Sequence, residues 1–92
     1  MTRTAAHQIS IPANVQRIAI ETWETEDGTT QGIIWDRTGL QSQDGEWGAQ
    51  IIDWEGDRDD AVICAEMAGF TVAEPIPYSI EGVEGAVAEA TR

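Results

Sequence analysis

The sequence contains no lysine, and this absence restricts the classes of function open to it. Its 92 residues carry 17 acidic side chains and five basic ones, for a net charge of −12. A chain this acidic does not neutralise phosphates, so we expect no direct binding to nucleic acid or to a membrane. The five basic residues are all arginine: Arg3, Arg17, Arg37, Arg58 and Arg92.

The shortage of cysteine and histidine excludes further kinds of site. One cysteine, Cys64, cannot build a disulfide framework, and one histidine, His7, leaves too few ligands for a zinc site. The acidic run from Asp53 fails as a calcium-binding EF-hand loop, because its sixth position is Arg58 and its twelfth is Cys64. No residue pattern indicates a catalytic nucleophile beside a base. We therefore expect no enzyme activity, no metal and no cofactor.

Long apolar runs are also missing. No segment has the roughly 18–20 apolar residues that a membrane-spanning helix needs, and the first residues do not read as a secretory signal. These absences predict a cytoplasmic protein. Hydrophobic residues make up 41% of the chain, which argues against disorder and predicts one folded domain over residues 1–92.

Alternating apolar residues predict strands over residues 15–24, 30–37 and 47–54, although a helix is a rival for the first. Glu26-Asp27-Gly28 and Asp44-Gly45 supply turn chemistry between them. Asp57 is a good helix N-cap for residues 58–68, and a short strand at 70–72 follows, with a possible edge segment at 78–81. The predicted fold is α+β: a small antiparallel sheet of three to four strands in the order β-β-β-α-β, with one main helix on one face.

The two ends of the chain carry weaker signals of secondary structure. Residues 1–8 are small and polar, and we expect a flexible arm. Residues 83–92 are rich in alanine but contain Gly85, which predicts a weak helix or a frayed tail.

The negative charge is concentrated in one part of the chain. Residues 21–60 hold twelve acidic residues and two arginines, a net charge of −10, together with all four tryptophans. A negative field speeds the encounter with a basic partner, and aromatic anchors supply affinity. The alternative is that the tryptophans serve the core.

Strand and helix periodicity single out three candidate exposed apolar residues. Trp23 alternates out of phase with Ile18 and Ile20, so it is expected on the polar face of its strand. Ile63 and Met67 fall on the side of the helix away from its stripe of small residues. They form an interaction patch unless the C-terminal tail covers them.

In size and acidity, with the interval from Glu21 to Asp60 and its tryptophans, the chain resembles the small acidic proteins by which phages disable host defence, such as anti-CRISPR proteins and DNA mimics. The resemblance implies an inhibitor that occupies the basic nucleic-acid-binding surface of a CRISPR effector complex and blocks access of target DNA or guide. The predicted partner is thus a basic protein or nucleoprotein complex, and the resemblance implies the host cytoplasm as the location if a phage encodes the chain. The candidate contact residues are Asp53, Glu55, Asp57, Asp59, Asp60, Trp23, Glu24, Glu26, Asp27, Ile63 and Met67.

Two alternatives remain open. Lysine depletion with acidic enrichment is also typical of proteins from salt-loving organisms, in which the acidity is general solvation. An immunity protein or antitoxin against a basic nuclease would use the same electrostatic logic.

Overall fold

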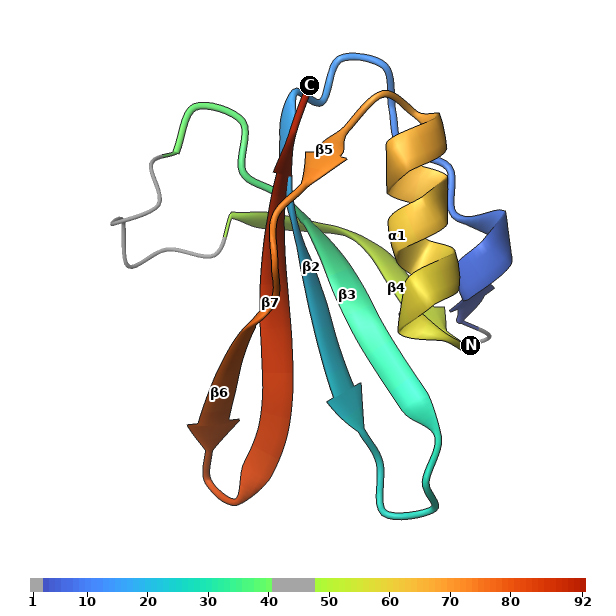
Figure 1. Ribbon diagram of the computed structural model, residues 1–92, viewed down its shortest axis with the longest axis vertical. Coiled ribbons are helices and arrows are strands. Elements are labelled where there is room, and N and C mark those ends of the chain that lie inside the picture. The colour runs from blue at the N-terminus through green and yellow to red at the C-terminus, as the bar shows by residue number, and fades with distance from the viewer. Residues whose placement is uncertain (1–2, 41–47) are drawn as a thin grey trace.

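A computed structural model describes residues 3–40 and 48–92, and there one curled sheet packs its inner face against a single α-helix (Figure 1). The strand order is β1-β4-β3-β2-β7-β5, with β6 also paired to β7. All strand pairs are antiparallel except β1 with β4. The elements are β1 Thr4–Ala5, the 3₁₀ helix η1 Ala6–Gln8, β2 Arg17–Glu24, β3 Thr30–Asp36, β4 Ala49–Glu55, α1 Arg58–Met67, β5 Thr71–Val72, β6 Ile76–Ile80 and β7 Val83–Thr91.

The core lies between the inner face of the sheet and α1. Its largest fully buried side chains are Ile18, Ile20, Ile34 and Trp54, from three adjacent strands. Ala61 and Ala65 of the helix are completely buried against them. Small helix residues allow α1 to approach the sheet closely, which confirms the predicted stripe of small side chains.

The β2–β3–β4 meander and the helix agree with the sequence prediction. Gly28 takes a φ of 84° in the β2–β3 turn, a conformation that glycine adopts without strain. The Asp57 side chain accepts a hydrogen bond from the backbone N–H of Asp59 at 2.9 Å, so it caps α1 as expected. The predicted turn at Asp44-Gly45, and Trp47, lie outside the described residues.

Arg92 fastens the C-terminal end of α1 to the segment before β2. Its guanidinium donates hydrogen bonds to the backbone oxygens of Pro12, Val15 and Ala68, at 2.7–2.8 Å, and lies 4.4 Å from the centre of the Phe70 ring. One side chain thus holds three segments together.

The predicted fold class was wrong in its sheet. Instead of three to four antiparallel strands, the described residues form seven strands in a mixed, strongly curled sheet. The additional pairs come from the two ends of the chain, where local sequence carries little strand signal. Long-range pairing overrides local propensity there.

The prediction of a weak helix or frayed tail over residues 83–92 was also wrong. Residues Val83–Thr91 form β7, which pairs with β2 on one edge and with β5 and β6 on the other. Ala88 and Ala90 are buried on the inner face, while Val87 and Glu89 alternate to the outer face. These alanines recur at every second residue, so they lie on the inner face of β7. Their small side chains leave room there for α1.

The predicted flexible arm over residues 1–8 was wrong for the part that the structure describes. Thr4 and Ala5 pair in parallel with Trp54 and Glu55. Ala6 is buried in the core, and its carbonyl accepts a hydrogen bond from the Cys64 thiol at 3.4 Å. Small side chains such as Ala6 suit this close packing, although they give no hydrophobic pattern.

Within the described ranges, none of the helices is both long and apolar enough to cross a membrane.

Candidate functional site

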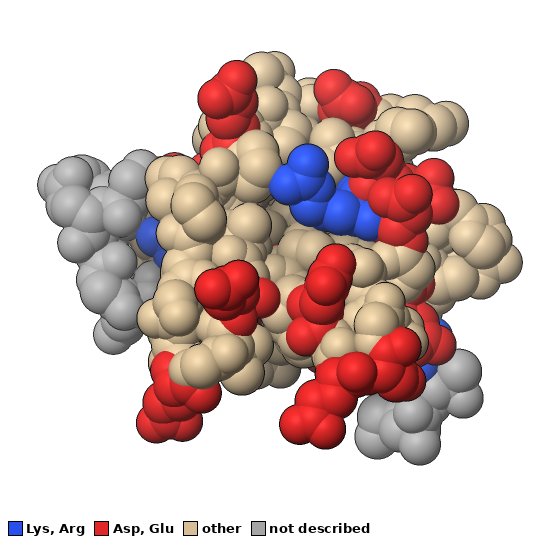
Figure 2. All heavy atoms as spheres, turned by 60° about the horizontal axis from the view of Figure 1, so that its bottom comes forward, with Lys and Arg blue, Asp and Glu red and all other residues tan. Residues whose placement is uncertain are grey.

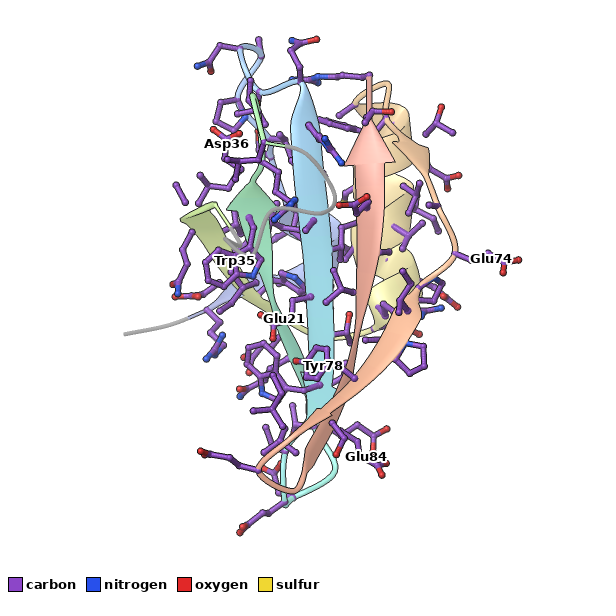
Figure 3. The ribbon with its side chains drawn as sticks, turned by 90° about the vertical axis from the view of Figure 1, so that its left-hand side faces the viewer. Glu21, Trp35, Asp36, Glu74, Tyr78 and Glu84 are labelled. Atoms are coloured by element: carbon purple, nitrogen blue, oxygen red, sulfur yellow. The ribbon has the colours of Figure 1, made fainter. Side chains whose placement is uncertain are left out.

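A hydrogen-bonded trio crosses the outer face of the sheet, on the side away from α1 (Figure 3). Glu21 accepts a hydrogen bond from Trp35 Nε1 at 3.0 Å through one carboxylate oxygen, and from the Tyr78 hydroxyl through the other. These side chains come from β2, β3 and β6. Partial burial and the neighbouring Glu21 carboxylate together raise the pKa of Tyr78 well above its ordinary value of 10.0.

The single tyrosine makes this interaction measurable by a pH titration. Because its pKa is raised in the folded chain, Tyr78 contributes stability below pH about 10, and this stability is lost as the pH rises above that value. We expect the phenolate absorbance to appear at lower pH in Glu21→Gln than in the parent. Glu74→Gln, which removes a carboxylate pointing away from Tyr78 (Figure 3), should leave the titration unchanged. Equal curves for parent and Glu21→Gln would contradict the assigned contact.

The predicted acidic run from Asp53 to Asp60 does not form one surface. Asp53 and Glu55 alternate with the buried Trp54, so they face away from α1. Asp59 and Asp60 lie in the first turn of α1, which covers the opposite face of the sheet. The structure therefore divides this run between two sides of the molecule.

The β2–β3 turn, in contrast, holds its acidic residues close together. Glu24, Glu26 and Asp27 are all exposed. The Asp27 carboxylate accepts hydrogen bonds from the Thr25 hydroxyl and from the Thr29 backbone N–H, the latter at 3.1 Å. These bonds, that of Thr25 first, lower the pKa of Asp27, because they favour its charged form.

Trp23 faces away from the core, as its strand position predicted, and is half-buried. The guanidinium of Arg3 lies 5.8 Å from the centre of its ring and 3.9 Å from an Asp53 carboxylate oxygen. Trp35 is also half-buried on the outer face, and Trp54 is completely buried. The three described tryptophans are thus divided between core and surface.

Ile63 and Met67 are exposed on α1, at 50% and 83%. The C-terminal segment that could have covered them is instead β7, on the sheet. Both side chains form an apolar patch on the helix side of the molecule.

Sequence reasoning missed the β6–β7 hairpin. Its side chains Ile76, Ile80 and Val83 are exposed apolar residues, and its tip carries Glu81 and Glu84. The Ile80↔Val83 and Ile76↔Val87 pairs place these apolar residues on the outer face. Alternation in Ile76–Ile80 was a usable signal, but Pro75 and Pro77 masked it.

An open cleft of about 1250 Å³, which we call the hairpin cleft, lies between the two hairpins. Its lining includes residues 22–26 of β2 and its turn, residues 81–86 of β6–β7, and Asp57 with Arg58 at the start of α1. Figure 2 looks onto this end of the molecule, where acidic side chains gather around a blue basic side chain. The cleft therefore joins two predicted contact regions, the β2–β3 turn and Asp57, to a third that was not predicted.

In the part of the chain that the structure describes, no cluster of three or more His, Cys, Asp or Glu side chains could hold a metal ion. The chemistry that the arrangement offers is recognition through carboxylates and aromatic rings.

Comparison with protein-family models, with curated proteins and with solved structures gives no match for this chain, so its own geometry carries the functional argument.

Proposed function

We propose that this chain is a binding inhibitor that presents carboxylates to a basic, nucleic-acid-binding surface of another protein. The observation that carries the proposal is the gathering of acidic side chains at the hairpin end of the molecule (Figure 2). Glu24, Glu26 and Asp27 come from one hairpin, and Glu81 and Glu84 from the other. A CRISPR effector is the target that the resemblance to anti-defence proteins implies, and it stays a prediction.

Rigid placement of charge supports this proposal. Mobile carboxylates lose conformational entropy when they bind, whereas carboxylates on paired strands and tight turns are already ordered. The Asp27 side chain is held by two hydrogen bonds, and Glu24 and Glu84 lie on strands. Such an array can occupy arginine and lysine side chains that otherwise bind phosphates.

The test is displacement of labelled DNA from purified nucleic-acid-binding proteins, with CRISPR effector complexes and a basic nuclease in the panel. We expect the chain to release DNA from at least one member, less effectively as salt shortens the Debye length below about 10 Å. The triple variant Glu24→Gln, Glu26→Gln, Asp27→Asn should raise the inhibitory concentration by about tenfold.

The matched control is Asp36→Asn, Glu66→Gln, Glu74→Gln, which removes the same charge from positions away from the hairpin end, Asp36 lying at the opposite end of β3 from the β2–β3 turn (Figure 3). Circular dichroism should be the same for all three proteins. If the chain releases DNA from none of the panel members, the proposal is contradicted. Loss of folded structure at about 0.1 M salt would instead favour general solvation in a salt-adapted protein.

A further inference from the structure

Three of the most exposed large apolar side chains lie together on the outer face of the sheet, at its hairpin end. They are Ile76, Ile80 and Val83, with exposed fractions of 69%, 54% and 47%. The register of β6 with β7 places all three on the same side as Tyr78. Helix α1 packs against the opposite, inner face, so it does not cover them.

This apolar surface continues across the sheet as an aromatic one (Figure 3). Gly85 pairs with Trp23, and the Tyr78 ring lies against Gly85, since a Cβ added to that glycine would be 2.5 Å from Tyr78 Cζ. Trp35 is joined to Tyr78 through the Glu21 carboxylate. The three rings are half-buried, so part of each stays exposed. We call this surface the outer patch, and its residues are Trp23, Trp35, Ile76, Tyr78, Ile80 and Val83.

The charged groups beside the outer patch have partners within the chain. Both oxygens of Glu21 accept hydrogen bonds, from Trp35 and from Tyr78. The ion pairs on this face are Arg3 with Asp53 at 3.9 Å, Arg17 with Glu89 at 3.4 Å and Arg37 with Glu89 at 3.5 Å. An unpaired charge is the main cost of burying a polar surface, and these contacts reduce that cost before any partner binds.

The outer face is also nearly neutral. The charged side chains that the described strands and their ion pairs place there are three positive and four negative, for a net charge of −1: Arg3, Arg17, Arg37, Glu21, Asp53, Glu55 and Glu89. The whole chain has a net charge of −12, so the rest of its surface is strongly acidic. A basic partner is attracted to that acidic surface, whereas a partner that is itself acidic meets the least repulsion at the outer face.

We propose that the outer patch binds a second copy of this chain, so that two sheets pack face to face in a symmetric dimer. A second copy has the chemistry that this surface fits, an apolar and nearly neutral face on an otherwise acidic protein. The sheets would lie about 10 Å apart, with the two α1 helices on the outside. A two-fold axis across the strands puts the acidic hairpin ends at opposite ends of the dimer, where they repel each other least.

Sedimentation equilibrium of the full chain, from about 1 μM to about 1 mM, measures the association. We expect the mass to rise from 10.0 kDa towards twice that value with increasing concentration. Affinity should increase at least about threefold between about 0.02 and 0.5 M salt, because salt screens the repulsion between two acidic chains. A chain that stays monomeric at every concentration, or a dimer that weakens as salt is added, would overturn the proposal.

The contribution of the outer patch is tested by the double variant Ile76→Gln, Ile80→Gln. It removes exposed apolar surface and should raise the dissociation constant of the dimer by about tenfold or more. The matched control is Ile63→Gln, Met67→Gln, which removes two exposed apolar side chains from α1 and should change the constant by less than about twofold. Equal weakening by the two double variants would show association through any apolar surface, and the outer patch would be rejected.

Backbone amide chemical shifts, recorded while the parent protein is diluted, locate the contact without any substitution. We expect concentration-dependent shifts at Trp23 and in residues 76–80 and 83–87, and shifts confined to α1 would overturn the assignment. The dimer does not depend on the proposed function. DNA release by a chain that stays monomeric rejects the dimer alone, whereas a dimer that releases no DNA rejects the inhibitor alone.

Discussion

Replacing Trp54 by alanine is expected to lower the free energy of unfolding by about 3–5 kcal/mol, the range for large aromatic side chains in a core. Trp54 is completely buried and is among the largest side chains of the described core. Total stability for a chain of this size is about 5–10 kcal/mol, so the variant should be close to unfolding at room temperature. Denaturant titration followed by circular dichroism measures the loss.

Two controls give this result its meaning. Trp23→Ala removes the same side chain from a half-buried position on the outer face. This variant should lose much less free energy of unfolding than Trp54→Ala. Trp54→Phe keeps most of the packing, and it removes an indole N–H that has no hydrogen-bond partner among the described residues. We expect the phenylalanine variant to keep most of the stability. A similar loss for Trp54→Ala and Trp23→Ala would contradict the assigned core.

Replacing Gly32 by alanine should be almost as destabilising, although it adds only one methyl group. An added Cβ would lie 2.1 Å from the backbone oxygen of Glu21 and 2.3 Å from the Trp54 ring. Neither group can move freely, because one belongs to a paired strand and the other fills the core. Overpacking of this kind costs about 3 kcal/mol, and thermal unfolding would show it as a lower Tm.

Gly28→Ala is the matched control for this substitution. Gly28 has a φ of 84° in the β2–β3 turn, and an added Cβ would meet no atom within 4 Å. Only the left-handed backbone conformation opposes alanine there, at about 1–2 kcal/mol. If the two variants unfold at the same temperature, the Trp54 ring does not lie over Gly32 as described.

Gly32 also shows why some of the core escapes sequence reasoning. The strand over residues 30–37 could be predicted from its apolar residues, but a glycine inside a strand has no side chain to indicate a partner. Its role follows from β4, which places Trp54 across it. The local sequence pattern predicted the two strands, whereas the contact between Gly32 and Trp54 depends on the register in which β3 and β4 pair.

At the two ends of the chain, local sequence predicts the structure even less well than at Gly32. Alanines at positions 86, 88 and 90 have high helix propensity, and it is the pairing of β7 with β2, β5 and β6 that makes them part of a strand. Conversely, the cap at Asp57 and the turn at Gly28 were predictable, because their signals lie within a few residues. For the candidate site, the exposure of Ile63 and Met67 was predictable, and the presence of both Glu24 and Glu84 in the lining of one cleft was not.

The place of β7 has a consequence for how the chain folds. It lies between β2 and the strands β5 and β6, and Arg17 pairs with Thr91 near the other end of the sequence. During synthesis β2, β3 and β4 can pair and α1 can pack on them before β7 is made, so the edge of β2 that pairs with β7 stays open until then. Contacts between such distant residues make folding slow. Mutual repulsion between chains of charge −12 opposes the aggregation of these half-formed sheets.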